Sequence, residues 1–135
     1  MNYSNSQRAG VILYLTASLF GGYDIALSVA NYITNNTTEN DKISVYGNWD
    51  FIYILSNRTH ATKYSYQFPI GEINPYIFTD YFKQLKQELP HIIVIQQGHL
   101  DNHISEFLST NNYALAWSEN YDSTEGALIY SHKQN

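Results

Sequence analysis

The chain has 135 residues, the size of one ordinary domain, and carries a formal net charge of −5 at pH 7 with 7 Lys and Arg in total. Basic residues so few and so scattered make no positively charged stripe, which argues against DNA and RNA as partners. With no cysteine, the chain has no disulfide bond, no thiolate metal ligand and no cysteine nucleophile.

Residues 1–23 are predicted to form a leader or connecting segment, and residues 24–135 a single α/β domain. The longest apolar run, Val11–Phe20, has about half of the length that spans a bilayer. Arg8 precedes this run, as in a secretory signal, but no small-residue cleavage site follows it. We interpret the run as a packed element or as the trailing end of a removed segment. Its type, helix or strand, stays open, as does whether Met1 is the native start.

A helix is predicted after the Gly21-Gly22 break. Asp24 suits the N-cap of this helix, which is expected to run to about Asn35. The helix should bury one narrow stripe, formed by Ile25, Val29 and Ile33 at four-residue spacing.

Ile43–Tyr46 is typical of a half-buried strand and is followed by a turn at Gly47-Asn48. The next segment, Trp49–Leu55, is ambiguous. Its composition favours a strand joined by a hairpin turn, but its apolar positions are consecutive instead of alternating, and Asn57 suits a helix end. We therefore predict a short helix, with the hairpin as the alternative.

A strand, a helix and a second strand are expected between residues 62 and 95. Thr62–Phe68 alternates aromatic and other residues, which predicts a strand that ends at Pro69. Pro75–Leu89 is the clearest helix, with Asn74 as its N-cap. The apolar stripe of this helix comprises Phe78, Phe82, Leu85 and Leu89. His91–Ile95 is a continuous β-branched run, which indicates a strand buried on both faces of a parallel sheet.

The carboxyl-terminal part predicts a helix and two strands. The helix carries Ile104, Phe107 and Leu108, and the strands Tyr113–Tyr121 and Ala127–His132 are separated by a loop of hairpin length. The alternation of helices and strands predicts an α/β, Rossmann-like three-layer fold with a mostly parallel sheet that ends in an antiparallel carboxyl-terminal hairpin.

A ligand crevice is expected where the strands end, because open α/β sheets bind ligands at the carboxyl ends of their strands. The candidate ligand-binding residues there are Asn48, Trp49 and His99, with Gly47 and Gln97 beside them. Arg58, near His60, is a candidate for binding an anion such as a lipid phosphate; an ordinary solvent-exposed role is the favoured alternative.

Other chemistry is weakly indicated. Gly47 is the only glycine in the turn directly after the first strand, so neither of the glycine-rich phosphate-binding patterns is present there. His99 and His103 flank Asp101 at a spacing that could ligate a divalent ion, but no third ligand is recognisable, and Asp101 or Asn102 also suits a helix N-cap. No serine lies in a nucleophile motif. We predict no catalytic residue, no metal and no cofactor.

Aromatic side chains offer one more interpretation. A sugar-stacking face could be built from Trp49, Tyr53, Tyr64 and Tyr66. Aromatic residues at these spacings more often pack in a core, so burial is the favoured alternative.

Four segments together resemble a known family. They are Val29–Ile33, Asp41–Gly47, Ile52–Arg58 and Leu89–Ile95. The pattern resembles the soluble domain that follows the last membrane span in bacterial polytopic glycosyltransferases of the dolichyl-phosphate-mannose-protein mannosyltransferase-like group. The resemblance extends from about Asp24 to Lys133 and rests on loose patterns, not on a catalytic motif.

This resemblance implies a domain at the extracytoplasmic face of the cell membrane, attached to a membrane portion of the same polypeptide that transfers sugar from a polyprenyl-phosphate donor. The catalytic acids of that family lie in its membrane portion and match no position here, so an accessory role without catalysis is implied. The expected partners are the membrane portion and, beyond it, the polyprenyl-phosphate sugar or a glycan or protein acceptor. The alternative is a free-standing α/β domain that binds or converts a small ligand at the strand ends.

Overall fold

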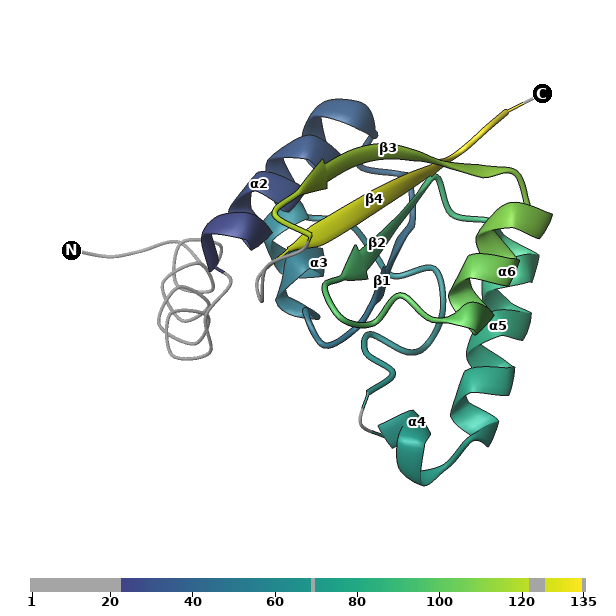
Figure 1. Ribbon diagram of the computed structural model, residues 1–135. Helices are drawn as coiled ribbons and strands as arrows, with labels where there is room; N and C mark the ends of the chain where they lie inside the picture. The colour runs from purple at the N-terminus through teal and green to yellow at the C-terminus, as the bar shows by residue number, and fades with distance from the viewer. Residues whose placement is uncertain (1–22, 69, 122–125, 135) are drawn as a thin grey trace.

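The computed structural model describes residues 23–68, 70–121 and 126–134 (Figure 1). Its elements, in chain order, are α2 (Tyr23–Asn36), β1 (Ile43–Tyr46), α3 (Phe51–Ser56), α4 (Ile70–Ile73), α5 (Tyr76–Glu88), β2 (Ile92–Gln96), α6 (Asn102–Thr110), β3 (Tyr113–Glu119) and β4 (Ala127–His132). Residues 1–22 of the predicted leader, with the apolar run of residues 11–20, lie outside the described residues, as do Pro69 and most of the loop before β4. Tyr23, the last residue of the predicted leader, instead belongs to α2.

The four strands form one mixed sheet in the order β1-β2-β4-β3. β1 and β2 are parallel, with Ile43 opposite Ile92 and Tyr46 opposite Ile95. β4 is antiparallel to both of its neighbours, β2 and β3. We call the edge of the sheet where β1 and β2 end the carboxyl edge, and the edge where they begin the amino edge.

The prediction of a Rossmann-like, mostly parallel sheet is wrong, because the sheet is mixed and only the β1–β2 pair is parallel. The α/β class and the antiparallel pairing of the last two strands are confirmed. β3 points in the same direction as β1 and β2, as the alternation of helices and strands suggested, but β4 lies between β2 and β3 and runs the opposite way. The order of elements along the chain does not reveal that β4, the hairpin partner of β3, is inserted between β2 and β3.

Helices cover both faces of the sheet, α2 and α3 on one side and α5 and α6 on the other (Figure 1). The residues of β2 alternate between the two resulting cores: Ile92 and Val94 pack with α2 and α3, whereas Ile93 and Ile95 pack with α5 and α6. All four of these side chains are buried. The predicted burial of this strand on both faces is thus confirmed.

The ambiguous segment after β1 is a helix, as predicted, and not a hairpin. Asn57 ends α3 in the left-handed conformation with φ of 53°, and its N–H donates to the carbonyls of Tyr53 and Ile54. Asn tolerates this conformation better than most residues do, which explains why the helix stops there.

The predicted strand of residues 62–68 is wrong. The residues just before this segment, 59–61, instead pair with the outer side of β1. Ile43 donates its N–H to the Thr59 carbonyl at 3.1 Å, and its carbonyl accepts the Ala61 N–H at 2.8 Å. After residue 61 the backbone leaves the sheet, and its polar groups are hydrogen-bonded by side chains instead of by a neighbouring strand. The Thr62 hydroxyl, for example, is bonded to both the carbonyl and the N–H of Tyr64.

Helix α5 starts and packs slightly differently from its prediction. The N-cap position falls on Pro75, while the Asn74 side chain accepts the Tyr76 N–H at 3.3 Å. Tyr81 and Leu85 are the buried side chains of this helix, and Leu89 is its exposed C-cap with φ of 43°. The buried face of α5 therefore includes Tyr81. A pattern that counts only apolar residues overlooks it, because tyrosine carries a polar hydroxyl; in the core this hydroxyl is hydrogen-bonded to Ser44.

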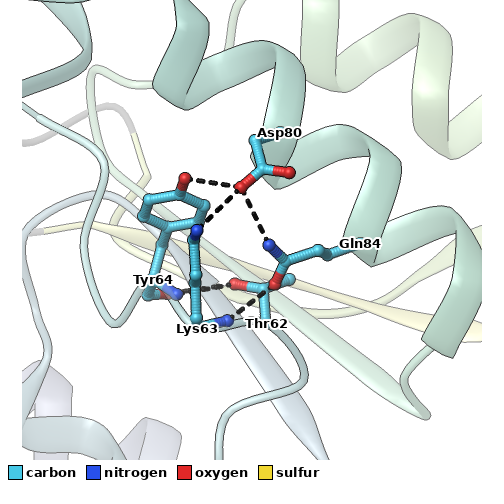
Figure 2. Close-up of polar contacts among 5 residues, drawn as sticks. All are labelled: Thr62, Lys63, Tyr64, Asp80 and Gln84. Atoms are coloured by element: carbon cyan, nitrogen blue, oxygen red, sulfur yellow. Dashed lines mark hydrogen bonds and ion pairs between the residues drawn. The ribbon is translucent and has the colours of Figure 1, made fainter.

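Asp80 ties the irregular segment of residues 62–64 to α5 (Figure 2). Its Oδ2 accepts from the Tyr64 hydroxyl at 2.7 Å and from Gln84 Nε2 at 3.0 Å, and it lies 3.2 Å from Lys63 Nζ. The bond from Tyr64 lowers the pKa of the Asp80 carboxyl, and Lys63 acts in the same direction. Gln84 completes the connection by accepting the Lys63 N–H at 2.9 Å.

Asp80→Ala is expected to loosen residues 62–64, because the three groups that meet at the carboxylate lose their common acceptor. Amide hydrogen exchange at Lys63 should become faster, since Gln84 is no longer held against it. Glu88→Gln is the matched control: it removes the exposed ion pair with Lys42 and should leave exchange at Lys63 unchanged. Unaltered exchange at Lys63 in Asp80→Ala would contradict the tethering role of the network.

Candidate functional site

The carboxyl edge is organised by the turn that follows β1. Gly47 adopts φ of 148° and donates its N–H to Oε1 of the buried Gln67 at 3.1 Å. The N–H of Asn48 donates to Oε1 of Gln96, the last residue of β2. The two glutamines thus hold the turn, so their amide oxygens are engaged in backbone structure.

The residues predicted to bind a ligand do not form one group. Asn48 is exposed at the carboxyl edge, whereas Trp49 is buried in the core against α2 and α3, with an exposed fraction of 7%. His99 is half-buried and stacks on Phe68 with ring centroids 4.3 Å apart. Asn48 and His99 therefore share an edge of the sheet but have different neighbours.

Arg58 lies at the amino edge, away from the other three. Its guanidinium donates to the Thr37 hydroxyl at 2.9 Å and to the Thr37 carbonyl at 3.2 Å. It also donates to the carbonyls of Ser56 and Asn57. These bonds fasten the end of α2 to the end of α3, and anion binding by Arg58 stays a prediction that would compete with them.

Asp101 caps α6, as the sequence suggested. Its Oδ1 accepts the Ile104 N–H at 3.0 Å, and its Oδ2 accepts the Tyr46 hydroxyl at 2.9 Å. Within residues 23–68, 70–121 and 126–134, no group of three or more His, Asp or Glu side chains is placed to hold a metal ion.

An aromatic cluster surrounds Tyr46 on the face covered by α5 and α6. Its ring lies 5.3–6.5 Å, centroid to centroid, from those of Phe68, Phe78, Tyr81 and Phe82. Tyr46 itself is fully buried. Aromatic pairs at these distances prefer edge-to-face and tilted arrangements, and the Tyr46–Phe68 pair is edge-to-face at 83°.

A pocket of about 340 Å³ opens beside this cluster, between α5 and the start of α6. We call it the aromatic pocket, and it is lined by Phe68, Pro75, Phe78, Thr79, Phe82, Asp101 and His103. A concave, mainly apolar site with a few convergent polar groups is the usual form of a small-ligand site, and this volume lies at the lower end of the usual range.

The electrostatics of the aromatic pocket are set by Asp101. Burial raises the pKa of the Tyr46 hydroxyl well above its ordinary value, and the bond to Asp101 acts in the same direction. Tyr46 therefore remains a donor and fixes the carboxylate as its acceptor. Burial lowers the pKa of the neighbouring His99, so its imidazole is neutral at neutral pH.

An open groove continues from the aromatic pocket between α5 and α6. It shares Thr79, Phe82 and His103 with the pocket and has Lys83 and Lys86 on one side and Glu106 on the other. A separate polar hollow of about 260 Å³ lies at the amino edge, where Lys42 pairs with Glu88 at 3.2 Å.

The sequence reasoning missed the aromatic pocket. Phe78 and Phe82 were assigned to the core stripe of α5, and Phe68 to a strand, yet all three are only partly buried. The available signal was the pair of phenylalanines at the start of the α5 stripe, Phe78 and Phe82, which follow Phe68 closely in the sequence.

Comparisons with protein-family models, with curated proteins and with solved structures found no match to this chain. None of the described helices combines the length and the apolar character needed to cross a membrane.

Proposed function

We propose that this chain is a non-catalytic accessory domain at the extracytoplasmic face of the cell membrane, belonging to a glycosyltransferase that uses a polyprenyl-phosphate sugar donor. The proposal rests on the resemblance of four segments to that family. Two of them fold as neighbouring units of the sheet: residues 41–47 contain β1, and residues 89–95 contain most of its parallel partner β2.

The structural observation that supports the proposal is an exposed apolar surface around α4. We call it the apolar tip; it consists of Ile70 and Ile73 of α4 and Tyr76 at the start of α5. Ile73 is 84% exposed and Tyr76 is 65% exposed. α4 lies at an end of the molecule away from the sheet (Figure 1). Neighbouring exposed apolar side chains are a candidate contact surface for a protein or membrane partner, and the membrane portion of the same polypeptide is the partner that the resemblance implies.

The polar groups of the carboxyl edge support an accessory role over a catalytic one. Gln67 and Gln96 hold the Gly47-Asn48 turn, and Asp101 holds the start of α6 and Tyr46. Side chains whose polar atoms fix the backbone are poorly placed to exchange protons with a substrate.

The double variant Ile73→Ser, Tyr76→Ser tests this proposal. Substitutions at exposed sites change the free energy of unfolding by only about 0.5 kcal/mol, so the domain should melt as before. Transfer of sugar from a polyprenyl-phosphate donor, measured in membranes that contain the full-length protein, should fall by at least about tenfold, since losing two apolar contacts costs more than about 1.4 kcal/mol.

Ile54→Ser is the matched control, because Ile54 is 58% exposed on α3 and lies outside the apolar tip. Its sugar transfer should equal that of the unmodified protein. Equal activity of the double variant would refute contact through the tip. A complete reading frame that encodes no membrane-spanning segments would refute the accessory role itself.

A free-standing domain that binds a small ligand is the second candidate function, and the aromatic pocket is the observation that favours it. The pocket lies at the carboxyl edge, where α/β sheets bind ligands. Under this alternative the double variant at the apolar tip would leave function intact, whereas substitutions in the pocket would abolish it.

A further inference from the structure

We propose that the aromatic pocket binds a compact organic cation, with its ammonium group between the phenyl rings and the Asp101 carboxylate. The inference goes beyond the proposed glycosyltransferase role and does not depend on it. It rests on the chemistry of the pocket wall, on the charges around it and on the way in which Asp101 is held.

The wall supplies aromatic surface from two parts of the chain. Phe78 and Phe82 come from one face of α5, four residues apart, and Phe68 comes from the segment before α4. Phe68 packs edge-on against Phe78 with centroids 5.1 Å apart and carries His99 stacked against it. The negative face of a phenyl ring attracts a cation, most strongly where water is partly excluded.

The carboxylate supplies the matching charge. Asp101 is held from both of its oxygens, by the Ile104 N–H and by the Tyr46 hydroxyl. A carboxylate offers about four lone-pair positions, so two protein donors leave capacity for a ligand. Its orientation is thus established before binding, which reduces the entropic cost of recognition.

The same arrangement disfavours an anion. The start of α6, which would otherwise attract negative charge, is already occupied by Asp101. Among the described lining residues of the pocket there is no Lys or Arg. Lys83 and Lys86 lie in the adjoining groove; both are exposed, and Glu106 lines the same groove, so solvent screens them.

Choline and its neutral isostere 3,3-dimethylbutan-1-ol test the proposal on the 135-residue chain. The two molecules have nearly the same shape and differ in the charge. Titrations followed by NMR, at pH 8 and constant ionic strength, should show choline binding at least about tenfold more tightly, with shifts at Phe82 and Asp101. Equal affinity for the two molecules, or binding of choline elsewhere, would overturn the inference.

Asp101→Asn removes the charge but keeps an oxygen that can cap α6, and it should weaken choline binding at least about tenfold. Asp41→Asn is its control, because Asp41 likewise accepts a backbone N–H, from Thr38 at 2.8 Å, but at the amino edge. It should leave choline affinity unchanged.

Phe82→Leu keeps apolar volume and removes one ring face, and it should also weaken choline while affecting the neutral alcohol less. Its control is Phe51→Leu, a partly buried ring on the other face of the sheet. Thermal unfolding identifies any variant that does not fold, and the comparison of the two ligands on the unmodified chain decides the question independently. Glucose or acetate binding in the pocket in place of choline would refute the assignment.

Discussion

Gly47→Ala is expected to lower the free energy of unfolding by about 3–5 kcal/mol, combining backbone strain with overpacking. Gly47 has φ of 148°, which L side chains rarely adopt. An added Cβ would lie 2.6 Å from Gln96 Cβ and 2.5 Å from its Oε1. Gln96 cannot move aside without releasing the Asn48 N–H, so the clash opens the turn that builds the carboxyl edge.

Gly98→Ala is the matched control for this prediction. Gly98 also has positive φ, at 84°, but an added Cβ would meet no atom within 4 Å. Its cost should be the conformational term alone, about 1–2 kcal/mol. Chemical denaturation of both variants provides the comparison, and equal losses would show that the contact with Gln96 contributes nothing.

Alkaline pH is expected to unfold the protein because several tyrosines are buried as neutral phenols. Burial raises the pKa of Tyr53 to about 12, although the Val45 N–H donated to its oxygen acts the other way. Burial raises the pKa values of Tyr46, Tyr81 and Tyr113 in the same direction. In the unfolded chain these groups ionise near pH 10.

The direction of the effect follows from proton binding. Above pH 10 the unfolded state loses phenolic protons that the folded state keeps, so stability is complete below pH 10 and falls as pH rises toward 12. Tyr53 alone accounts for about 2 kcal/mol over these two pH units. The other buried tyrosines add to this loss, which brings it into the range of the whole stability of a small domain.

Tyr53→Phe separates this contribution. The variant should be less stable at pH 8 by about 1–3 kcal/mol, because the buried Val45 N–H loses its acceptor. Between pH 10 and 12, however, it should lose about 2 kcal/mol less stability than the unmodified protein. Urea unfolding at a series of pH values measures both quantities. If the free energy of unfolding falls equally steeply with pH in the unmodified protein and in Tyr53→Phe, the alkaline loss of stability does not come from Tyr53.

Much of the fold could be predicted because the responsible patterns are local. The β-branched run of β2, the left-handed stop at Asn57 and the Asp101 cap each depend on neighbours within a few residues. The place of β4 between β2 and β3 could not be predicted, since it depends on pairing between segments more than thirty residues apart. The strand predicted for residues 62–68 failed for a similar reason, because the outer side of β1 is paired with residues 59–61 instead.

The candidate site was less predictable than the fold. Sequence reasoning placed a site at the carboxyl edge, and the structure places the aromatic pocket there, but with different residues. Trp49 is buried in the core against α2 and α3 instead of lining the site. Asp101 was treated as a cap or a metal ligand, and its bond to Tyr46, 55 positions earlier in the chain, could not be read from spacing.

The two edge strands of the sheet, β1 and β3, differ in how they could pair with a strand of another molecule. Along the outer side of β1, Ile43 is paired with residues 59 and 61, and the Val45 N–H is bonded to the Tyr53 hydroxyl, so little remains for a foreign strand. β3 forms the other margin and contains a register shift between Leu115 and Trp117. Such an irregularity interrupts a continuous ladder. The occupied outer side of β1 thus resists intermolecular β-pairing, and at β3 the irregularity works against it, a protection against aggregation for a domain with an exposed apolar tip.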